Sequence, residues 1–158
     1  ALDRAARTVD VEGGVVWGDL VRHLLPHGLA PPVLTNNLTV TVGGTLSTAG
    51  VGVASFRYGT QGDQVAELDV VTGTGDIVTC GPDKKPDLFW AAIAGLGQAG
   101  IITRARIRLR EFKPMTRTYY LLYDDVATFM SDAARAMDDP RWDHLESWAS
   151  PCPACGRR

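Results

Sequence analysis

The stretch from Thr35 to Gly52 carries the residue types that best suit the binding of an anionic, planar ligand. Its β-branched run, Thr39 to Val42, predicts a short strand that stops at the pair Gly43 and Gly44. Without a Cβ, these glycines can leave bare backbone amides for a phosphate group to approach. Short hydroxyl side chains, which can donate hydrogen bonds to a ligand, stand at Thr41, Thr45, Ser47 and Thr48. A glycine-rich turn between two strands, with no ligand, explains the same residues equally well.

A second glycine-rich run, Gly95 to Gly100, matches the spacing G-x-G-x-x-G of dinucleotide-binding Rossmann folds. That motif requires a strand before the glycines and a helix after them. Here a predicted helix over residues 87–94 precedes the run, and a predicted strand over residues 101–110 follows it. The sequence therefore argues against a Rossmann site.

Four arginines alternate with apolar residues along the predicted strand 101–110, at Arg104, Arg106, Arg108 and Arg110. Such a row can bind a polyanion, but the formal net charge of −2 gives no support for a nucleic-acid partner. The solvated face of an antiparallel sheet explains the arginines better.

Two pairs of residues have the spacing of metal ligands, but neither is complete. His23 and His27 lie four residues apart, yet Pro26 stands between them and no third ligand is near in sequence, which favours capping or solvent-facing histidines. Cys152 and Cys155 form a single C-x-x-C, whereas zinc sites usually need a second pair and redox motifs need a βαβ context. We therefore predict no metal site, and we expect residues 150–158 to be a disordered or artefactual tail.

The elements that must position these residues follow from periodicity and turn signals. Strands are predicted at residues 7–11, 66–72, 76–80, 101–110 and 116–123, and helices at 16–25, 87–94 and 126–137. Gly28 is expected to end the first helix, and Asp124 or Asp125 to cap the last one. Residues 30–34 are expected to form an extended connector, residues 54–62 a loop, and Asp69 and Asp76 ordinary exposed residues of the hairpin.

Composition sets the outer bounds of this interpretation. The 158 residues suit about one domain, and 45% hydrophobic and 22% charged residues are ordinary for a globular protein. No apolar run approaches the ~20 residues of a membrane span, so a membrane partner is not expected. The first residue, Ala1, is not an initiator Met and no targeting pattern follows, so we expect a piece of a longer protein, with the cytoplasm as its default location.

Five segments are distinctive when they are read in order: Thr41–Gly50, Phe56–Gly59, Glu67–Gly73, Asp87–Phe89 and Gly95–Arg106. Together they are similar to the FAD-binding domain (PCMH type) of FAD-linked oxidases, the vanillyl-alcohol oxidase family. The resemblance covers about Thr8 to Leu109, and the cytokinin dehydrogenase branch is the nearest. Five collinear segments are a far more specific signal than any single glycine motif.

The resemblance implies an α+β fold with FAD as cofactor. Residues 1–113 would form the second subdomain of the FAD-binding domain, an antiparallel sheet with flanking helices, and residues 114–149 the beginning of a substrate domain. The implied reaction oxidises a C–N or C–O bond of a small-molecule substrate, with oxygen or another compound as electron acceptor. The alternative is a non-catalytic remnant that binds a nucleotide weakly or not at all.

By position, the family's flavin contacts fall on Thr41, Gly43, Gly44, Ser47, Val51 and Ile101. Two departures from the family pattern stand beside them. The Gly-His-Ser motif that usually tethers the flavin is missing from this chain. The resemblance implies that cytokinin dehydrogenases carry an Asp at the position of Asn36, where it accepts a proton from the substrate amine. An Asn cannot act as this base, because its amide takes no proton near neutral pH.

Overall fold

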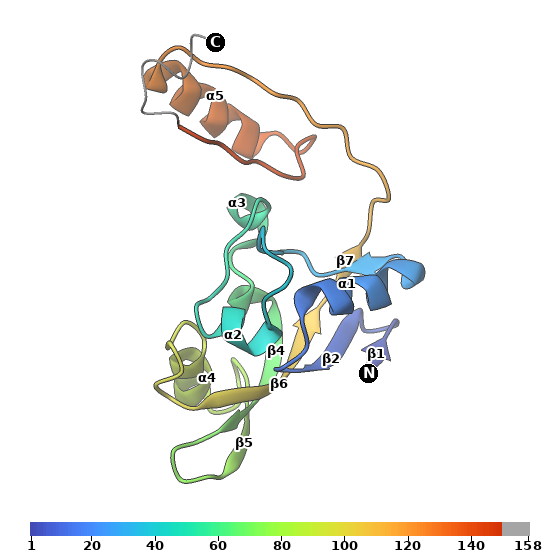
Figure 1. The fold of residues 1–158 in the computed structure, drawn as a ribbon, viewed down its shortest axis with the longest axis vertical. Helices are drawn as coiled ribbons and strands as arrows, with labels where there is room; N and C mark the ends of the chain where they lie inside the picture. Colours follow the sequence, from blue (N-terminus) through green and yellow to red (C-terminus); the bar gives the residue numbers. More distant parts are fainter. Residues whose placement is uncertain (150–158) are drawn as a thin grey trace. The chain divides into compact units, whose positions relative to one another are not determined.

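A five-stranded antiparallel sheet forms the centre of the first of two compact units, Ala1–Leu122, in a computed structural model that describes residues 1–149. Its strands, in spatial order, are β1 (Leu2–Asp3), β2 (Thr8–Glu12), β6 (Ile101–Arg108), β4 (Val65–Val71) and β5 (Ile77–Cys80) (Figure 1). A separate two-stranded sheet pairs β3 (Leu29–Ala30) with β7 (Arg110–Glu111). Four of the five strands predicted before residue 111 are confirmed, and so is the α+β character of the chain.

One face of the large sheet packs against the helices α1 (Trp17–Leu24), α2 (Val42–Leu46) and α4 (Pro86–Ala92). Side chains alternate along a strand, so every second residue reaches this core, except where the register between β4 and β6 shifts by one residue. The buried residues of these strands are Val9, Val11, Val65, Leu68, Val70, Ile102, Ala105 and Ile107. The helices predicted near residues 16–25 and 87–94 are confirmed. Gly28, with φ of 70°, ends the short 3₁₀ turn Leu25–His27 that continues α1.

The run Thr39 to Val42 forms no strand, so this prediction was wrong. Thr41 instead caps the N-terminus of α2, where its hydroxyl accepts a hydrogen bond from the Gly44 amide at 3.3 Å. Val42 and Leu46 lie one helical turn apart and are both fully buried. Burial of this pair on one helical face outweighs the β-propensity of the run. The predicted loop 54–62 likewise contains a short helix, α3 (Ser55–Tyr58), and leads into the 3₁₀ turn Gly62–Gln64.

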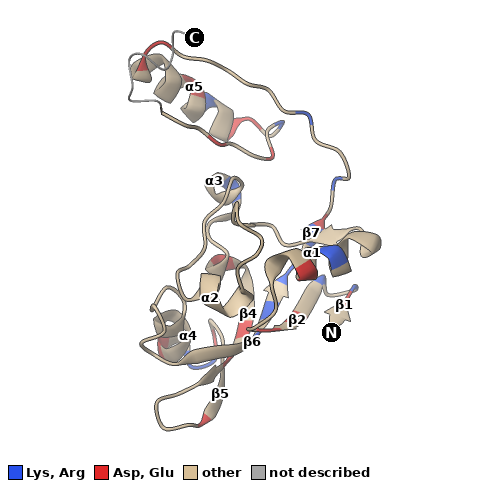
Figure 2. Cartoon of the chain, viewed as in Figure 1, with Lys and Arg blue, Asp and Glu red and all other residues tan. Residues whose placement is uncertain are grey.

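The other face of the large sheet carries an ion-pair network on β2, β4 and β6, where Figure 2 marks both acidic and basic residues. The Arg104 side chain is 25% exposed and contacts the carboxylates of Asp10, Glu67 and Asp69. Hydrogen bonds from Arg104 lower the pKa of Asp69 below its ordinary value, against the opposing effect of burial. The prediction of a merely solvated arginine face was therefore wrong for Arg104, and Asp69 is not an ordinary exposed residue.

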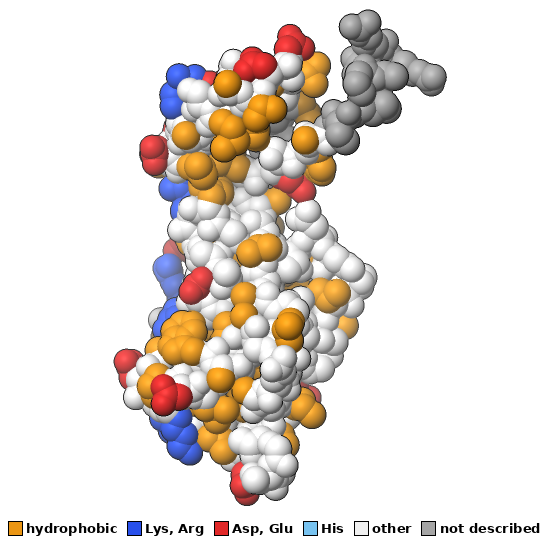
Figure 3. Space-filling view, turned by 90° about the vertical axis from the view of Figure 1, so that its left-hand side faces the viewer, with side chains coloured by type: hydrophobic (Ala, Val, Ile, Leu, Met, Phe, Trp, Pro, Cys, Tyr) orange, Lys and Arg blue, Asp and Glu red, His pale blue; other side chains and the backbone are white. Residues whose placement is uncertain are grey.

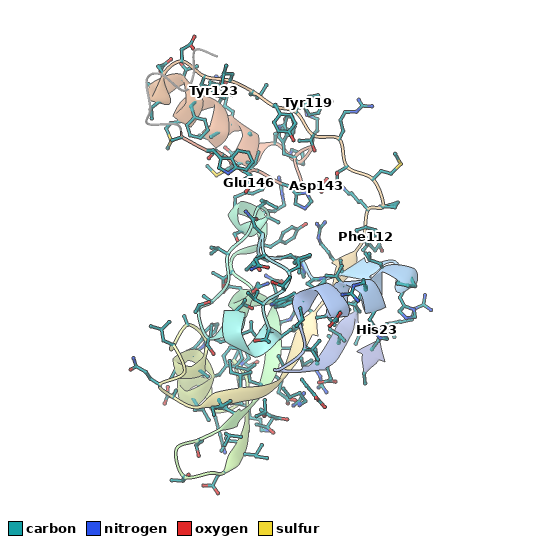
Figure 4. All side chains as sticks on the ribbon, viewed as in Figure 1. His23, Phe112, Tyr119, Tyr123, Asp143 and Glu146 are labelled. Carbon is teal, nitrogen blue, oxygen red and sulfur yellow. The ribbon has the colours of Figure 1, made fainter. Side chains whose placement is uncertain are left out.

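The second compact unit, Tyr123–Arg158, contains the helix α5 (Val126–Asp138), which confirms the helix predicted there. Asp125 is the cap, since its carboxylate accepts a hydrogen bond from the Thr128 amide at 2.8 Å. Tyr123 lies along α5 (Figure 4) and donates a hydrogen bond from its hydroxyl to Asp132 at 3.0 Å. Apolar side chains gather on the surface around this helix (Figure 3), among them Val126, Met130 and Met137.

The strand predicted at residues 116–123 does not form, because nothing in the described chain offers it a partner strand for backbone hydrogen bonds. Residues 112–125 lie in no helix or strand. The domain boundary expected between residues 113 and 114 stays a prediction. The expected tail, 150–158, with Cys152 and Cys155, lies outside the described residues. Within residues 1–149, no helix is long and apolar enough to cross a membrane.

Candidate cofactor site

The backbone amides at the start of α2 are already bonded within the protein. The Val42 amide donates to the carbonyl of Val15 at 2.9 Å, and the Gly43 amide donates to the carbonyl of Gly13 at 2.8 Å. The Gly44 amide donates to the Thr41 hydroxyl. The expectation that Gly43 and Gly44 present bare amides to a phosphate was therefore wrong, because the amides complete the cap of α2 and its attachment to the Gly13 turn.

Gly43 and Gly44 lack a side chain for different reasons. Gly43 is buried, and a Cβ there would lie 2.9 Å from the Ile102 carbonyl oxygen and 3.1 Å from that of Gly13. This glycine lets α2 approach the sheet closely. Gly44 is exposed, and a Cβ there would meet, within 4 Å, one described atom outside its own helix backbone and chain neighbours, the Thr41 Oγ1 at 2.8 Å. The outer side of α2 is therefore open to a ligand at Gly44.

The hydroxyls of α2 are largely used inside the protein. Thr45 accepts a hydrogen bond from the buried indole N–H of Trp17 at 2.7 Å, and donates to the Val42 carbonyl at 3.2 Å. Ser47 donates to the Gly43 carbonyl at 2.9 Å, so its lone pairs, rather than its proton, face outward. Thr41 is exposed and accepts from Gly44, which leaves its proton available to an acceptor.

Two of the predicted cofactor contacts are exposed apolar residues on segments other than α2. Val51 is 67% exposed on the loop that follows α2, and Ile101 is 68% exposed at the start of β6. The next residue, Ile102, is the one whose carbonyl contacts Gly43. The structure thus brings the predicted residues of α2 close to the beginning of β6.

The second glycine run closes the C-terminal end of α2. The amides of Ala94 and Leu96 donate to the carbonyls of Leu46 and Ser47 at 3.0 and 2.9 Å. These bonds satisfy carbonyls that the helix leaves without an internal partner. The run lies between α4 and β6, so the predicted absence of the strand–glycine–helix order of a Rossmann site is confirmed.

Asn36 lies on the connector before α2, not on α2 itself. The connector is tied to α1, because the amides of Trp17 and Gly18 donate to the carbonyls of Val40 and Leu38 at 3.1 and 2.8 Å. Asn36 is exposed, while its neighbour Asn37 accepts hydrogen bonds from the amide and hydroxyl of Thr39 at 2.9 and 2.7 Å. A local turn therefore fixes Asn37 and leaves residue 36 at the surface.

Metal and thiol chemistry have little support among residues 1–149. His23, on α1 (Figure 4), stands edge-to-face with His27, with ring centroids 5.8 Å apart. In this described part of the chain, no three or more His, Cys, Asp or Glu residues gather as a metal site would require. Burial raises the pKa of the Cys80 thiol, so this cysteine is poorly suited to act as a nucleophile.

The sequence model of the FAD-binding domain matches residues 1–81, just over half of the chain. The chain belongs to the FAD-binding domain family. The resemblance to FAD-linked oxidases is thereby confirmed, and with it FAD as the cofactor of the family. The chain is 56% identical to cytokinin dehydrogenase 7 of Oryza sativa subsp. japonica over 128 residues, which are 81% of the chain and 24% of the relative.

Other relatives of the chain are also cytokinin dehydrogenases. Cytokinin dehydrogenase 6 of the same rice is 55% identical over 128 residues, which are 81% of the chain and 24% of the relative. Cytokinin dehydrogenase 4 is 45% identical over 145 residues, 91% of the chain and 27% of the relative. The chain thus spans about a quarter of the length of the curated relatives it matches.

The residues present on the outer side of α2 fit FAD. Gly44 leaves room for close approach, and Thr41 can donate a hydrogen bond to a ribityl, phosphate or ring oxygen. Val51 and Ile101 offer the exposed apolar surface that a planar ring requires. Sequence reasoning missed Gly13, where a Cβ would lie 2.2 Å from the Ile102 carbonyl oxygen. A Gly-Gly pair after a strand signals a turn, but only the fold shows that α2 packs against it.

Proposed function

We propose that the protein carrying this chain is an FAD-dependent oxidoreductase similar to cytokinin dehydrogenases. It oxidises a C–N or C–O bond of a small molecule and passes the electrons to oxygen or another acceptor. The observation that carries the proposal is the 56% identity to rice cytokinin dehydrogenase 7 over 81% of this chain. The family match over residues 1–81 supports FAD as the cofactor of that reaction.

In this proposal, residues 1–113 are the second subdomain of the FAD-binding domain and residues 114–149 begin the substrate domain. The flavin ring is the hydride acceptor of such reactions. Thr41 donates a hydrogen bond to the cofactor, and Gly44 permits its close approach. Val51 and Ile101 pack against it, while Gly43 acts through the placement of α2. Ser47 accepts rather than donates, because its proton is bonded to the Gly43 carbonyl.

Asn36 can orient a substrate but cannot act as its general base. Its amide oxygen can accept a hydrogen bond from a substrate N–H or O–H and so orient it. It cannot remove the proton, since the amide takes none near neutral pH. We therefore propose that oxidation of adenine-type cytokinins is slow here and that another group, or water, receives the proton of the preferred substrate.

A chimera tests the proposal in a complete protein. The stretch of rice cytokinin dehydrogenase 7 that matches this chain is replaced by the chain's own residues; the 56% identity makes the packing compatible. We expect the purified chimera to show a flavin absorption spectrum and slow cytokinin oxidation. Asn36→Asp should then raise the rate by about 10²–10⁴-fold, the usual contribution of a general base.

Asn37→Asp is the matched control, because it adds the same charge one residue away. The Asn37 side chain accepts hydrogen bonds from the amide and hydroxyl of Thr39, and an Asp there can accept them equally. The rate of this control should stay near that of the unaltered chimera. Fast cytokinin oxidation without any substitution would show that the base lies elsewhere.

The non-catalytic alternative is favoured by one observation, the internal bonding of the amides at Val42, Gly43 and Gly44. These amides cannot bind a phosphate without breaking the cap of α2. A colourless, folded chimera would support this alternative and contradict the proposed oxidoreductase.

A further inference from the structure

Gln61 is a buried polar residue outside the proposed cofactor contacts. Only 2% of it is exposed, and its Nε2 donates to the Val33 carbonyl at 3.4 Å. Its Oε1 is buried and accepts no hydrogen bond within the described chain. An unpaired buried acceptor disfavours the folded state, so the presence of glutamine at this position requires an explanation other than stability.

Gln61 stands where three segments of the chain meet. Its own amide donates to the Gly50 carbonyl at 2.8 Å, and the next amide, of Gly62, donates to the Ala49 carbonyl at 3.0 Å. Gly50 has a φ of 65°, and a Cβ there would lie 2.1 Å from the Gln61 Oε1. The glutamine side chain therefore fills the space that the missing side chain of Gly50 leaves.

The third segment is the connector that carries Asn36. Val33, which accepts the hydrogen bond from the Gln61 side chain, lies three residues before Asn36. The connector also contacts the loop after α2, since a Cβ on Gly52 would lie 1.8 Å from the Leu34 carbonyl oxygen. Gln61 thus contacts both the segment that carries Asn36 and the loop that carries Val51.

We propose that Gln61 is a positioning residue that sets the placement of the loop Ala49–Gly52 relative to the connector Val33–Asn36. The inference rests on the proposed function, in which Val51 contacts the flavin and Asn36 the substrate. The role depends on the side-chain amide of Gln61, which donates a hydrogen bond to the Val33 carbonyl; an apolar side chain of similar size cannot do so. Leucine would fill much of the same space and remove the unpaired acceptor, so stability alone would favour it.

The first test needs no cofactor. Hydrogen exchange of the 158-residue chain is followed by mass spectrometry for the unaltered protein, Gln61→Leu and the control Gln98→Leu. Gln98 is an exposed glutamine, so this control makes the same chemical change at the surface. In Gln61→Leu we expect roughly three- to tenfold faster exchange at residues 50–52 and 61–62, as for loss of one hydrogen bond. Exchange in β4 and β6 should be no faster than in the unaltered protein, and the Tm should be no lower.

Two outcomes would overturn the positioning role. Unchanged exchange at residues 50–52 and 61–62 would show that the side chain does not hold the junction. An equal acceleration in β4 and β6 would show that Gln61 contributes only to global stability. Both outcomes are readable whether or not the chain binds FAD.

The second test uses the chimera with rice cytokinin dehydrogenase 7. In Gln61→Leu we expect higher fluorescence per bound flavin than in Gln98→Leu, because the ring is held less firmly when the loop of Val51 loosens. Equal flavin spectra and fluorescence in both variants would contradict the link between Gln61 and the cofactor. A chimera that binds no flavin before any substitution would contradict the proposed function instead, and the exchange measurement would still decide whether Gln61 holds the junction.

Discussion

The guanidinium of Arg104, on β6, and the carboxylate of Asp69, on β4, form a two-bond ion pair across neighbouring strands. Nε donates to Oδ2 at 2.5 Å and Nη2 donates to Oδ1 at 3.0 Å. Arg104 also contacts Asp10 on β2 and Glu67 on β4, so one side chain connects three strands. A bidentate pair of this kind fixes geometry as well as contributing energy, and here it lies directly across the sheet from the core.

Replacing Arg104 by Gln should destabilise the chain by about 2–3 kcal/mol, somewhat less than the 3–5 kcal/mol for breaking a fully buried pair. The loss arises because Asp10, Glu67 and Asp69 would lose the one cation that contacts all three carboxylates. Arg108→Gln is the matched control, since the Arg108 guanidinium donates to backbone carbonyls, those of Val65 and Asp63, at 3.3 and 3.4 Å. Urea unfolding measures both variants, and equal unfolding midpoints would contradict a special role for Arg104.

The same network predicts a loss of stability in acid. The pKa of Asp69 is lowered mainly by hydrogen bonds from Arg104. Burial raises the pKa of Asp10, but the hydrogen bonds and charges of Arg106 and Arg104 outweigh burial, so the pKa of Asp10 is also lowered. Groups with a depressed pKa in the folded state stabilise it fully above the ordinary value of 3.8. That contribution should disappear as the pH falls below 3.8 through the lower folded-state values.

Unfolding followed by circular dichroism between pH 7 and pH 2 measures this effect. The double variant Asp10→Asn, Asp69→Asn should be less stable at pH 7 and should show a shallower decline below pH 3.8, because its amides do not titrate. Parallel pH profiles for the variant and the unaltered chain would assign the acid loss to other carboxylates.

The sequence predicts most elements of this unit because local patterns and tertiary packing agree there. Alternation along 101–110 and the hairpin 66–80 signal strands, and those strands find partners. The pattern fails at Thr39–Val42, where the same β-branched residues supply a helix cap and one buried helical face. It fails again at residues 116–123, where strand-forming side chains have no partner strand among the described residues.

The candidate site shows a similar limit. Motif similarity places Thr41, Gly44, Val51 and Ile101 on exposed positions, as a ligand site requires. It does not reveal that the amides of Gly43 and Gly44 are already bonded, because those partners come from the Gly13 turn and a cap. Gln61 gave no signal of its own, since a buried side chain with one unpaired atom is recognisable only in three dimensions.

Gly44→Val should strongly reduce the flavin content of the chimera. The branched side chain would occupy the open outer side of α2 and would press on the Thr41 hydroxyl. Gly73→Val is the control, because Gly73 is also exposed and an added Cβ there would meet no described atom within 4 Å beyond its chain neighbours. The ratio of flavin to protein absorbance is the measurement. A Gly44→Val chimera with normal flavin content would remove Gly44 from the cofactor site.

The 158-residue chain alone should bind FAD weakly or not at all and should form no covalent adduct. In the proposed architecture the flavin lies between two subdomains, and this chain, which matches about a quarter of the length of its relatives, supplies contacts from one side. It also has no Gly-His-Ser motif. Titration with FAD, followed by denaturation and desalting, measures both points. Micromolar or tighter binding would mean that the site is complete within this chain.

The segment before α5 should make the isolated chain self-associate. Tyr120, Leu121 and Leu122 are exposed, Leu122 to 95%, and residues 116–123 belong to no strand. An apolar, strand-forming segment without a partner is a template for pairing with a second copy of itself. Leu122→Lys should therefore lower the associated fraction in sedimentation velocity, because a charge on such a segment opposes pairing.

Val126→Lys is the matched control for that experiment. Val126 is also apolar and 74% exposed, but it lies in α5, whose backbone bonds are made within the helix. Its substitution adds the same charge and should change the associated fraction much less. An equal decrease in both variants would indicate that net charge, and not the segment 116–123, controls association; no decrease in either would exclude this segment as the contact between copies.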